Sequence, residues 1–221
     1  MFPLFVDRLD AGRQLAAALL RYANRPDIVV LGLPRGGVPV AAEVAAALHA
    51  PLDALMVRKL GVPGHEELAM GAIASGGLRV LNDDVLRDLR LPASAIDAVE
   101  QRERTELERR ERAYRGDRPM PDLRGKTVIV VDDGLATGAT MRAALGAIRR
   151  QAPAWLVAAA PVAAPSVREM LRDVADDIVL VAAPSPFYAV GAWYGSFPPT
   201  TDDEVRDALA RSLAAGASPA A

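Results

Sequence analysis

The chain has 221 residues, of which 51% are hydrophobic and 24% are charged, with no cysteine and a formal net charge of −2. This balance is typical of a globular protein with a substantial core and excludes a disordered chain. The lack of cysteine excludes disulfides and cysteine metal sites, and the small net charge gives no general attraction to nucleic acid or to an anionic membrane.

The apolar stretches predict a cytoplasmic protein without membrane contact. The N-terminal segment MFPLFVDRLD reaches acidic residues too early to form the apolar core of a signal peptide. The longest apolar stretch, residues 152–167, contains three prolines and is too short to cross a membrane.

Helices and strands are predicted to alternate along most of the chain. In order, the predicted elements are a helix at 11–22, a strand at 28–33, a helix at 40–49, and strands at 55–58 and 127–131, then a helix at 139–150, a strand at 155–160, a helix at 166–174, a strand at 178–182 and a helix at 201–213. The continuous apolar strands fit a parallel sheet that is covered on both faces. The sequence therefore predicts an α/β protein with a doubly wound, mainly parallel sheet.

Residues 74–125 interrupt this alternation. A hairpin is expected around Ser75-Gly76-Gly77, followed by one long charged helix near 93–114. Arginine and glutamate mix along that helix at helical spacing, which indicates a solvated or subunit-packing face rather than a nucleic-acid patch. We expect a single domain over residues 1–213, with this excursion inside it, and a disordered tail at 214–221.

The most informative segment is TVIVVDDGLATGAT, at 127–140. Asp132 and Asp133 directly follow a buried strand, and the small residues after them open a helix near Gly138. Backbone N–H groups and hydroxyls at the start of a helix form an anion site that suits a phosphate. The adjacent carboxylates instead accept hydrogen bonds from vicinal hydroxyls. The segment therefore predicts a site for a ribose 5-phosphate.

This segment resembles the motif with which type I phosphoribosyltransferases bind 5-phosphoribosyl-1-pyrophosphate (PRPP). The resemblance implies that Asp132 and Asp133 hold the ribose 2′- and 3′-hydroxyls. It also implies that the following loop holds the 5′-phosphate, through Ala136, Thr137, Gly138, Ala139 and Thr140. The cofactor expected from the family is Mg²⁺, which the substrate would carry, so that the two aspartates would be only indirect ligands.

A second strand end fits the same family. Arg35, Gly36 and Gly37 follow the strand at 28–33 and resemble the family's pyrophosphate loop. Two glycines let the backbone approach a ligand closely, and an arginine supplies a bidentate donor.

A third segment is similar to the R-K-x-G and flexible-loop region of the family. Arg58 and Lys59 lie at the end of the strand predicted at 55–58, and the resemblance implies that the lysine contacts pyrophosphate. The glycine-punctuated segment 61–71 would close over the reacting sugar as a lid. Within this lid, Glu66 and Glu67 are the candidate acid/base groups.

The acceptor is expected to stack on an aromatic side chain near the C-terminus. Tyr188 precedes a V-G step as in the family, and Trp193 lies close to it in the sequence. Family members that use 6-oxopurines carry an aspartate where this chain has Ala136, and a lysine on the strand that corresponds to 155–160. Both are missing here, so we expect a nitrogenous acceptor other than a 6-oxopurine.

Together these features predict a Mg²⁺-dependent phosphoribosyltransferase of nucleotide salvage. It would move the phosphoribosyl group from PRPP to a small-molecule acceptor, release pyrophosphate, form a homo-oligomer and bind no nucleic acid. The alternative is a non-catalytic regulator of the same fold, which Arg35, Lys59 and the predicted lid disfavour. A receiver domain, which also carries paired aspartates after a strand, is excluded because no lysine follows Asp133.

Overall fold

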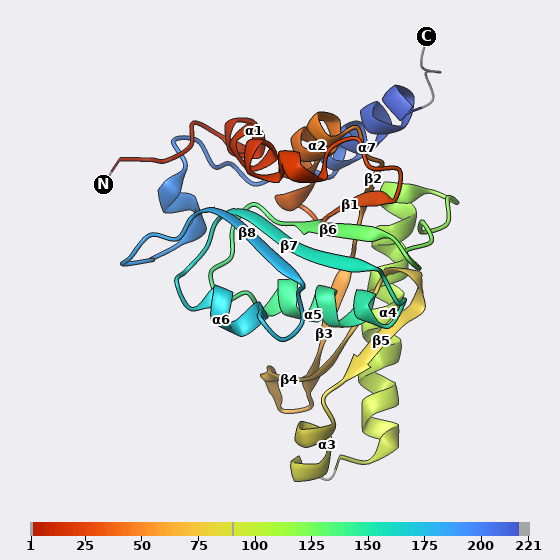
Figure 1. Cartoon of the computed structure of the whole chain (residues 1–221). Coiled ribbons are helices and arrows are strands. Elements are labelled where there is room, and N and C mark those ends of the chain that lie inside the picture. The colour runs from red at the N-terminus through yellow and green to blue at the C-terminus, as the bar shows by residue number, and fades with distance from the viewer. Residues whose placement is uncertain (1, 90, 217–221) are drawn as a thin grey trace.

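The computed structural model describes residues 2–89 and 91–216, and its main sheet consists of five parallel strands in the order β2-β1-β6-β7-β8. The strands are β1 (Ile28–Gly32), β2 (Leu52–Ala54), β6 (Thr127–Val131), β7 (Trp155–Val162) and β8 (Asp177–Ala182). Figure 1 shows one face covered by α1 (Arg8–Leu19), α2 (Gly37–Leu48) and α7 (Asp202–Gly216), and the other by α5 (Ala139–Arg149) and α6 (Val167–Leu171). The predicted doubly wound α/β fold is confirmed.

Each central strand supplies side chains to both faces of the sheet. In β1, Ile28 and Val30 pack into the core beneath α1 and α2, whereas Val29 and Leu31 pack into the core beneath α5. Every residue of β1 and of β6 is buried. Because helices cover both faces, these strands are apolar along their whole length rather than in alternation.

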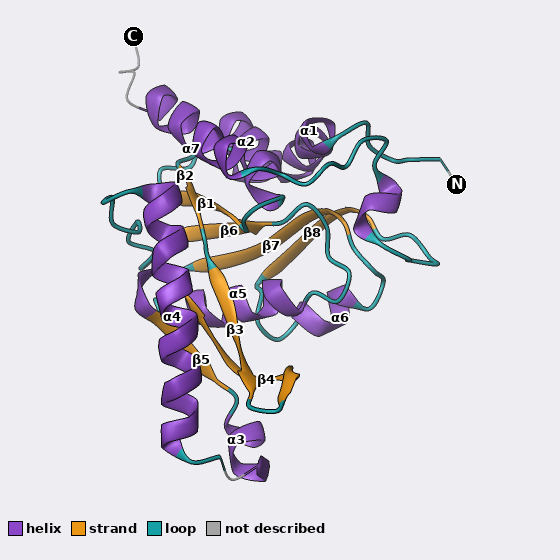
Figure 2. Cartoon of the chain, turned by 180° about the vertical axis from the view of Figure 1, so that it is seen from behind, coloured by secondary structure: helices purple, strands orange, loops and turns teal. Residues whose placement is uncertain are grey.

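The excursion between β2 and β6 forms a second, antiparallel sheet in the order β3-β4-β5. Its strands are β3 (Val57–Val62), β4 (His65–Ala74) and β5 (Leu78–Leu81). The 3₁₀ turn η2 (Ser75–Gly77) joins β4 to β5, which confirms the hairpin predicted there. Figure 2 shows this sheet projecting from the main body, with α4 (Ala93–Arg115) along its side and α3 (Asp83–Leu89) at its tip.

The long helix α4 has an apolar face and a charged face. Ile96 and Leu107 are buried in the core that α4 shares with the antiparallel sheet. On the charged face, Glu106 accepts a hydrogen bond from Arg110 one turn later, at 2.7 Å. The structure thus confirms ion pairs between successive turns on this face.

The strand predicted at 55–58 is wrong in its bounds. The short edge strand β2 ends at Ala54, Leu55 and Met56 connect the two sheets, and a new strand begins at Val57. An uninterrupted apolar run does not reveal this change of direction, because its side chains are buried on both sides of the bend. Lys59 consequently lies within an antiparallel strand and not at the end of a parallel one.

The segment 61–71, predicted as a loop, is a hairpin formed by β3 and β4. The pairing is irregular around Gly61, where a Cβ atom would lie 2.7 Å from the carbonyl oxygen of Glu66. Glycine therefore lets the two backbones approach each other at this irregularity. The motion of the hairpin as a lid stays a prediction.

The last helix begins as predicted but ends later. Thr201 and Glu204 form the predicted capping box, in which the Glu204 N–H donates to Thr201 Oγ1 at 3.2 Å and the Thr201 N–H donates to Glu204 Oε2 at 2.7 Å. Helix α7 continues to Gly216, so the predicted tail at 214–221 is wrong for its first residues, and 217–221 lie outside the described residues. In the described part of the chain, none of the helices combines the length and hydropathy of a membrane span.

Candidate functional site

The two predicted ribose-binding carboxylates lie directly after β6, at the carboxyl end of the main sheet. Asp132 Oδ1 accepts a hydrogen bond from the Asp133 N–H at 2.9 Å, and Asp133 Oδ2 accepts one from Arg8 Nε at 2.8 Å. Among the described residues, no hydrogen bond reaches Asp132 Oδ2 or Asp133 Oδ1. Neither oxygen is closed off from solvent. Each carboxyl group therefore presents one open acceptor.

Burial governs the charge of this pair. It raises the pKa of both carboxyls, and the neighbouring charge of Asp133 raises the pKa of Asp132 further, to well above its usual range. The Arg8 guanidinium lowers the pKa of both carboxyls and so acts in the opposite direction. A ligand that donates hydrogen bonds to the pair would stabilise its ionised form.

The loop after the carboxylates has the geometry of an anion site. Leu135 is buried and its N–H donates to Val162 O at 2.9 Å, which fixes the loop against the end of β7. Gly138 precedes α5 with φ of 71°, a conformation that favours glycine. The exposed residues of the loop are Ala136, Thr137, Ala139 and Thr140. Ala136 and Thr137 precede α5, and Ala139 and Thr140 open its first turn, where a helix leaves N–H donors without intrahelical partners.

The predicted pyrophosphate loop packs directly against the carboxylates. A Cβ atom at Gly36 would lie 1.9 Å from Asp133 Oδ2, and one at Gly37 would lie 2.7 Å from Val131 O. No side chain larger than hydrogen fits at either position without displacing the neighbouring group. The two glycines thus let the loop between β1 and α2 meet the end of β6.

Arg35 lies exposed in the same loop, near the junction of two helices. Its Nη1 is 3.8 Å from Oδ1 of Asp202, the first residue of α7. The same Asp202 oxygen accepts a hydrogen bond from the Tyr114 hydroxyl of α4 at 2.5 Å. Burial and this bond raise the pKa of Tyr114 to about 12. The contact of Arg35 is long and solvated, so this side chain can be redirected to a ligand at little energetic cost.

Arg58 and Lys59 point to opposite faces of the antiparallel sheet. Arg58 Nε donates to Glu103 Oε2 of α4 at 2.8 Å. Lys59 is exposed and, by the alternation of side chains along a strand, shares its face with Val57, which packs into the core that includes α5. Lys59, and not Arg58, therefore faces the side of the sheet against which α5 packs.

The candidate acid/base and stacking residues differ in exposure. Glu66 is exposed on β4, and the side chain of Glu67 lies outside the described part of the structure. Tyr188 is 76% exposed, whereas Trp193 is only 5% exposed and its ring centre lies 6.2 Å from that of Phe187. As the chain is folded here, Tyr188 offers a free ring face and Trp193 is part of the core.

Two side chains at the site carry no signal in the sequence. Arg8, at the start of α1, bonds to Asp133 across 125 residues of chain. The hydroxyl of Tyr194 donates to the main-chain oxygen of Asp133 at 2.5 Å, and burial raises the Tyr194 pKa, so it stays a protonated donor. Neither belongs to a motif with fixed spacing, because their contacts arise only when distant segments pack together.

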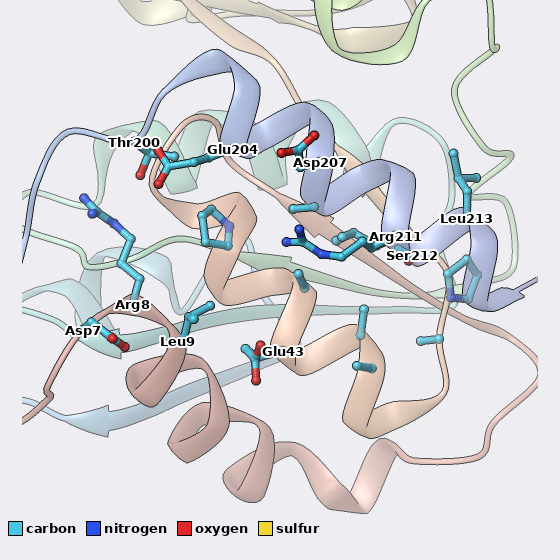
Figure 3. Close-up of a pocket in the computed structure, with 18 of the residues that line it drawn as sticks. Asp7, Arg8, Leu9, Glu43, Thr200, Glu204, Asp207, Arg211, Ser212 and Leu213 are labelled. Carbon is cyan, nitrogen blue, oxygen red and sulfur yellow. The ribbon is translucent and has the colours of Figure 1, made fainter.

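A cavity of about 1220 Å³ lies between α1, α2 and α7, away from the predicted motifs. Of the described residues that contact the carboxylate pair, only Arg8 also lines this cavity. Figure 3 shows Arg8 at one end of it, opposite Ser212 and Leu213. Among the described residues, no group of three or more His, Asp or Glu side chains gathers around a position for a metal ion.

Comparisons with known proteins agree with this geometry. Residues 6–187 match the family model described as phosphoribosyl transferase domain. A Mycobacterium tuberculosis protein with the provisional name phosphoribosyl transferase MT0597 is 50% identical over 202 residues, which cover 91% of this chain and 45% of that protein, so the chain spans about half of its length.

Two further relatives match this chain over different shares of its length. The crystal structure of TT1426 from Thermus thermophilus is 43% identical, with a TM-score of 0.86, over 96% of this chain and 99% of that one. An adenine phosphoribosyltransferase of Mycobacterium avium is 32% identical over 149 residues, 67% of this chain and 62% of that protein. With the family model covering most of its length, the chain belongs to the phosphoribosyl transferase domain family.

Proposed function

We propose that this chain is a Mg²⁺-dependent phosphoribosyltransferase, which transfers the 5-phosphoribosyl group of PRPP to a nitrogenous acceptor and releases pyrophosphate. The observation that carries the proposal is the packing of Gly36 against Asp133. It joins a glycine loop to two carboxyls with one open oxygen each, and an anion site follows at the start of α5. Pyrophosphate, ribose and phosphate occur in this order in PRPP.

Each part of the ligand would meet donors or acceptors of the matching kind. The ribose hydroxyls donate to Asp132 Oδ2 and Asp133 Oδ1, and the 5′-phosphate accepts from the N–H groups of residues 136–140. The leaving pyrophosphate accepts from the backbone at Gly36 and Gly37. Arg35 and Lys59 then supply the cationic side chains for its charge.

The carboxylate pair fits a substrate-borne Mg²⁺. Carboxylate oxygens are the hard donors that Mg²⁺ prefers, but Asp133 already carries a cation on Oδ2, so direct coordination there is disfavoured. Oxygens of PRPP would hold the ion, so Asp132 and Asp133 would act on it only indirectly, through the substrate. When bound, the metal neutralises charge on the departing pyrophosphate.

The chemistry requires no protein nucleophile. The bond between the anomeric carbon and the pyrophosphate oxygen breaks, a bond from that carbon to the acceptor nitrogen forms, and the acceptor nitrogen loses its proton. Glu66 or Glu67 in the β3–β4 hairpin would accept this proton. Closure of the hairpin would keep water from the activated sugar.

The acceptor would be a ring that stacks on Tyr188, whose face is free. Ala136 leaves no carboxylate beside the base, and β7 bears no lysine to read a 6-oxo group. These two features support an acceptor other than a 6-oxopurine. Action in nucleotide salvage, a cytoplasmic location and assembly as a homo-oligomer stay predictions.

The test combines binding with turnover. Titration calorimetry with PRPP, with and without Mg²⁺, should detect Mg²⁺-dependent binding that Asp133→Asn weakens. Pyrophosphate release should then be measured with PRPP and a panel of purines, pyrimidines and amines. Binding without release for any acceptor would favour the regulatory alternative, and no binding of PRPP would refute both.

A further inference from the structure

We propose that the cavity between α1, α2 and α7 is a groove at which two copies of this chain form a dimer. In this dimer a two-fold axis relates the copies, and α7 of one copy runs antiparallel to α7 of the other, so that each α7 covers the partner's groove. The dimer does not depend on the transfer chemistry proposed above. The size of the groove, its charges and two exposed leucines support a second copy as the occupant.

The groove has an apolar floor on α2. Pro39, Ala42 and Ala46 line it from successive turns of this helix. Figure 3 shows α2 between α1 and α7. Because none of the three floor residues carries a long side chain, another helix can approach α2 closely there.

The volume of the groove suits a helix rather than a small molecule. The groove holds about 1220 Å³, whereas sites for small ligands usually hold about 300–1000 Å³. With a diameter of about 10 Å and a rise of about 1.5 Å per residue, roughly ten residues of a helix fill such a space. The face of α7 that lines the groove, from Glu204 to Leu213, has this length.

Two charged side chains of α7 face the groove without a partner. Asp207 and Arg211 both line it and are exposed, and within the described part of the chain neither makes a hydrogen bond or an ion pair. Glu204, in contrast, is held in the capping box with Thr201. Because a covered charge is costly unless it is paired, the occupant must offer a cation to Asp207 and an anion to Arg211.

Helix α7 of a second copy meets both requirements. Asp207 and Arg211 are four residues apart, so they are neighbours on one face of the helix. A two-fold axis that crosses α7 between them places Asp207 opposite the partner's Arg211, and Arg211 opposite the partner's Asp207. The charges of α7 are therefore complementary to themselves, which favours a second copy over an unrelated protein.

The same axis covers two exposed leucines. Leu9, near the start of α1, is 43% exposed, and Leu213, near the end of α7, is 45% exposed. Figure 3 shows these two residues at opposite ends of the groove. With the two α7 helices antiparallel, Leu213 of one copy approaches the end of the groove that contains the partner's Leu9. Both leucines then lose contact with water as the dimer forms.

The test is an exchange of charge across the axis, measured by sedimentation velocity and light scattering over a concentration series. The wild type should form a dimer. Asp207→Arg places cations opposite cations, and Arg211→Asp places anions opposite anions, so each variant alone should associate about tenfold or more weakly. An equal mixture of the two variants should form a heterodimer with an affinity close to that of the wild type, because each contact across the axis again joins opposite charges.

Matched controls separate the interface from the fold. Asp203→Arg makes the same change of charge on α7, but at a position outside the groove. Ala47→Arg adds a long side chain to an exposed position of α2 that does not line the groove, whereas Ala46→Arg adds it to the floor. Ala46→Arg should abolish the dimer, and the two controls should leave it unchanged. Circular dichroism melting curves show whether each variant is folded.

Three results would overturn the inference. A wild type that stays monomeric at every concentration would leave the groove to another partner. Unchanged association in Asp207→Arg, Arg211→Asp and Ala46→Arg would place the dimer on another surface. Weaker association in both charge variants without recovery in their mixture would refute the antiparallel pairing of α7.

Two further comparisons keep the test decisive. If a charge variant fails to fold, Ala46→Arg against Ala47→Arg decides, and equal association in these two refutes the inference. Titration of PRPP with Mg²⁺ is measured separately on the wild type. A monomer that binds PRPP would refute the dimer and leave the proposed function intact, whereas a dimer of the expected kind that binds no PRPP would refute the proposed function alone.

Discussion

At the scale of single residues, the buried carboxylate pair lowers the stability of the ligand-free protein at neutral pH. Burial and the charge of Asp133 raise the pKa of Asp132, so the folded chain holds this proton more tightly than the unfolded chain does. The contribution of this carboxyl to stability is therefore full at acidic pH, below the usual aspartate pKa, and is lost as pH rises through the raised value. The ionised Asp132 carboxyl, which we propose binds the ribose, thus lowers the stability of the ligand-free protein.

Asp132→Asn should accordingly stabilise the free protein at neutral pH while abolishing tight PRPP binding. Each pKa unit of the upward shift corresponds to about 1.4 kcal/mol, and each kcal/mol to about 2–4 °C in a chain of this size. Differential scanning calorimetry should show a melting temperature raised by a few degrees at neutral pH, with a difference that shrinks in acid. A difference independent of pH would contradict this electrostatic origin.

Gly36 is the second residue whose substitution gives a definite expectation. In Gly36→Ala the new Cβ would occupy the place of Asp133 Oδ2, so either the carboxylate or the pyrophosphate loop must move. A displacement of about 1 Å costs up to about 10²-fold in rate, and we expect kcat/KM to fall on that scale. Gly146→Ala on α5 is the control, because its Cβ would meet nothing within 4 Å. Comparable losses in both variants would deny a special role for Gly36.

At the scale of elements, the C-terminal end of α4 is tied to the main sheet by a buried ion pair. Arg115 Nε donates to Asp53 Oδ2 of β2 at 2.9 Å, and its Nη2 donates to Ala54 O at 2.7 Å. Both side chains are less than a tenth exposed. This pair fixes the antiparallel sheet and its helix to the edge strand of the parallel sheet.

Arg115→Met should therefore be strongly destabilising, since it leaves the Asp53 carboxylate buried without its partner. Removal of one member of a buried pair costs about 3–5 kcal/mol. Arg109→Met on the same helix is the control, and its exposed pair with Glu106 should contribute little. Urea denaturation of both variants measures the difference. Equal free energies of unfolding would show that the Asp53–Arg115 pair does not anchor α4.

The elements that the sequence predicted well are those whose signal is local. The strands β1 and β6 are fully buried apolar runs, and the start of α7 carries its own capping box. The bend after Leu55 was missed because both flanking strands bury apolar residues, and only pairing with distant strands separates them. For the same reason, the sequence wrongly placed Lys59 at the end of a parallel strand, whereas it lies within the antiparallel strand β3.

At the scale of the whole molecule, the sequence predicted those parts of the candidate site that are each formed by one continuous segment of the chain. The carboxylates, the anion loop and the glycine loop each follow a strand, so topology brings them to one edge of the sheet. Arg8 and Tyr194 reach Asp133 from the two ends of the chain, and such contacts have no spacing to detect. Trp193 was a candidate stacking residue because it lies near Tyr188 in the sequence, but the packing of the C-terminal segment buries it.

The arrangement of the two sheets leads to the last prediction, which concerns the β3–β4 hairpin. It projects from the main body with Lys59 and Glu66 exposed, and it is joined to the body through β3 and α4. If the hairpin closes on the leaving pyrophosphate, PRPP with Mg²⁺ should slow hydrogen exchange of the amides at 61–68. At about a hundredfold excess over Kd, ligand binding stabilises a closed state by about 2.7 kcal/mol, a slowing of up to about a hundredfold. Lys59→Ala should remove this protection while leaving that of residues 136–140, for which we propose binding of the 5′-phosphate. Equal exchange of the hairpin in free and bound wild-type protein would show that it is a fixed part of the fold and not a lid.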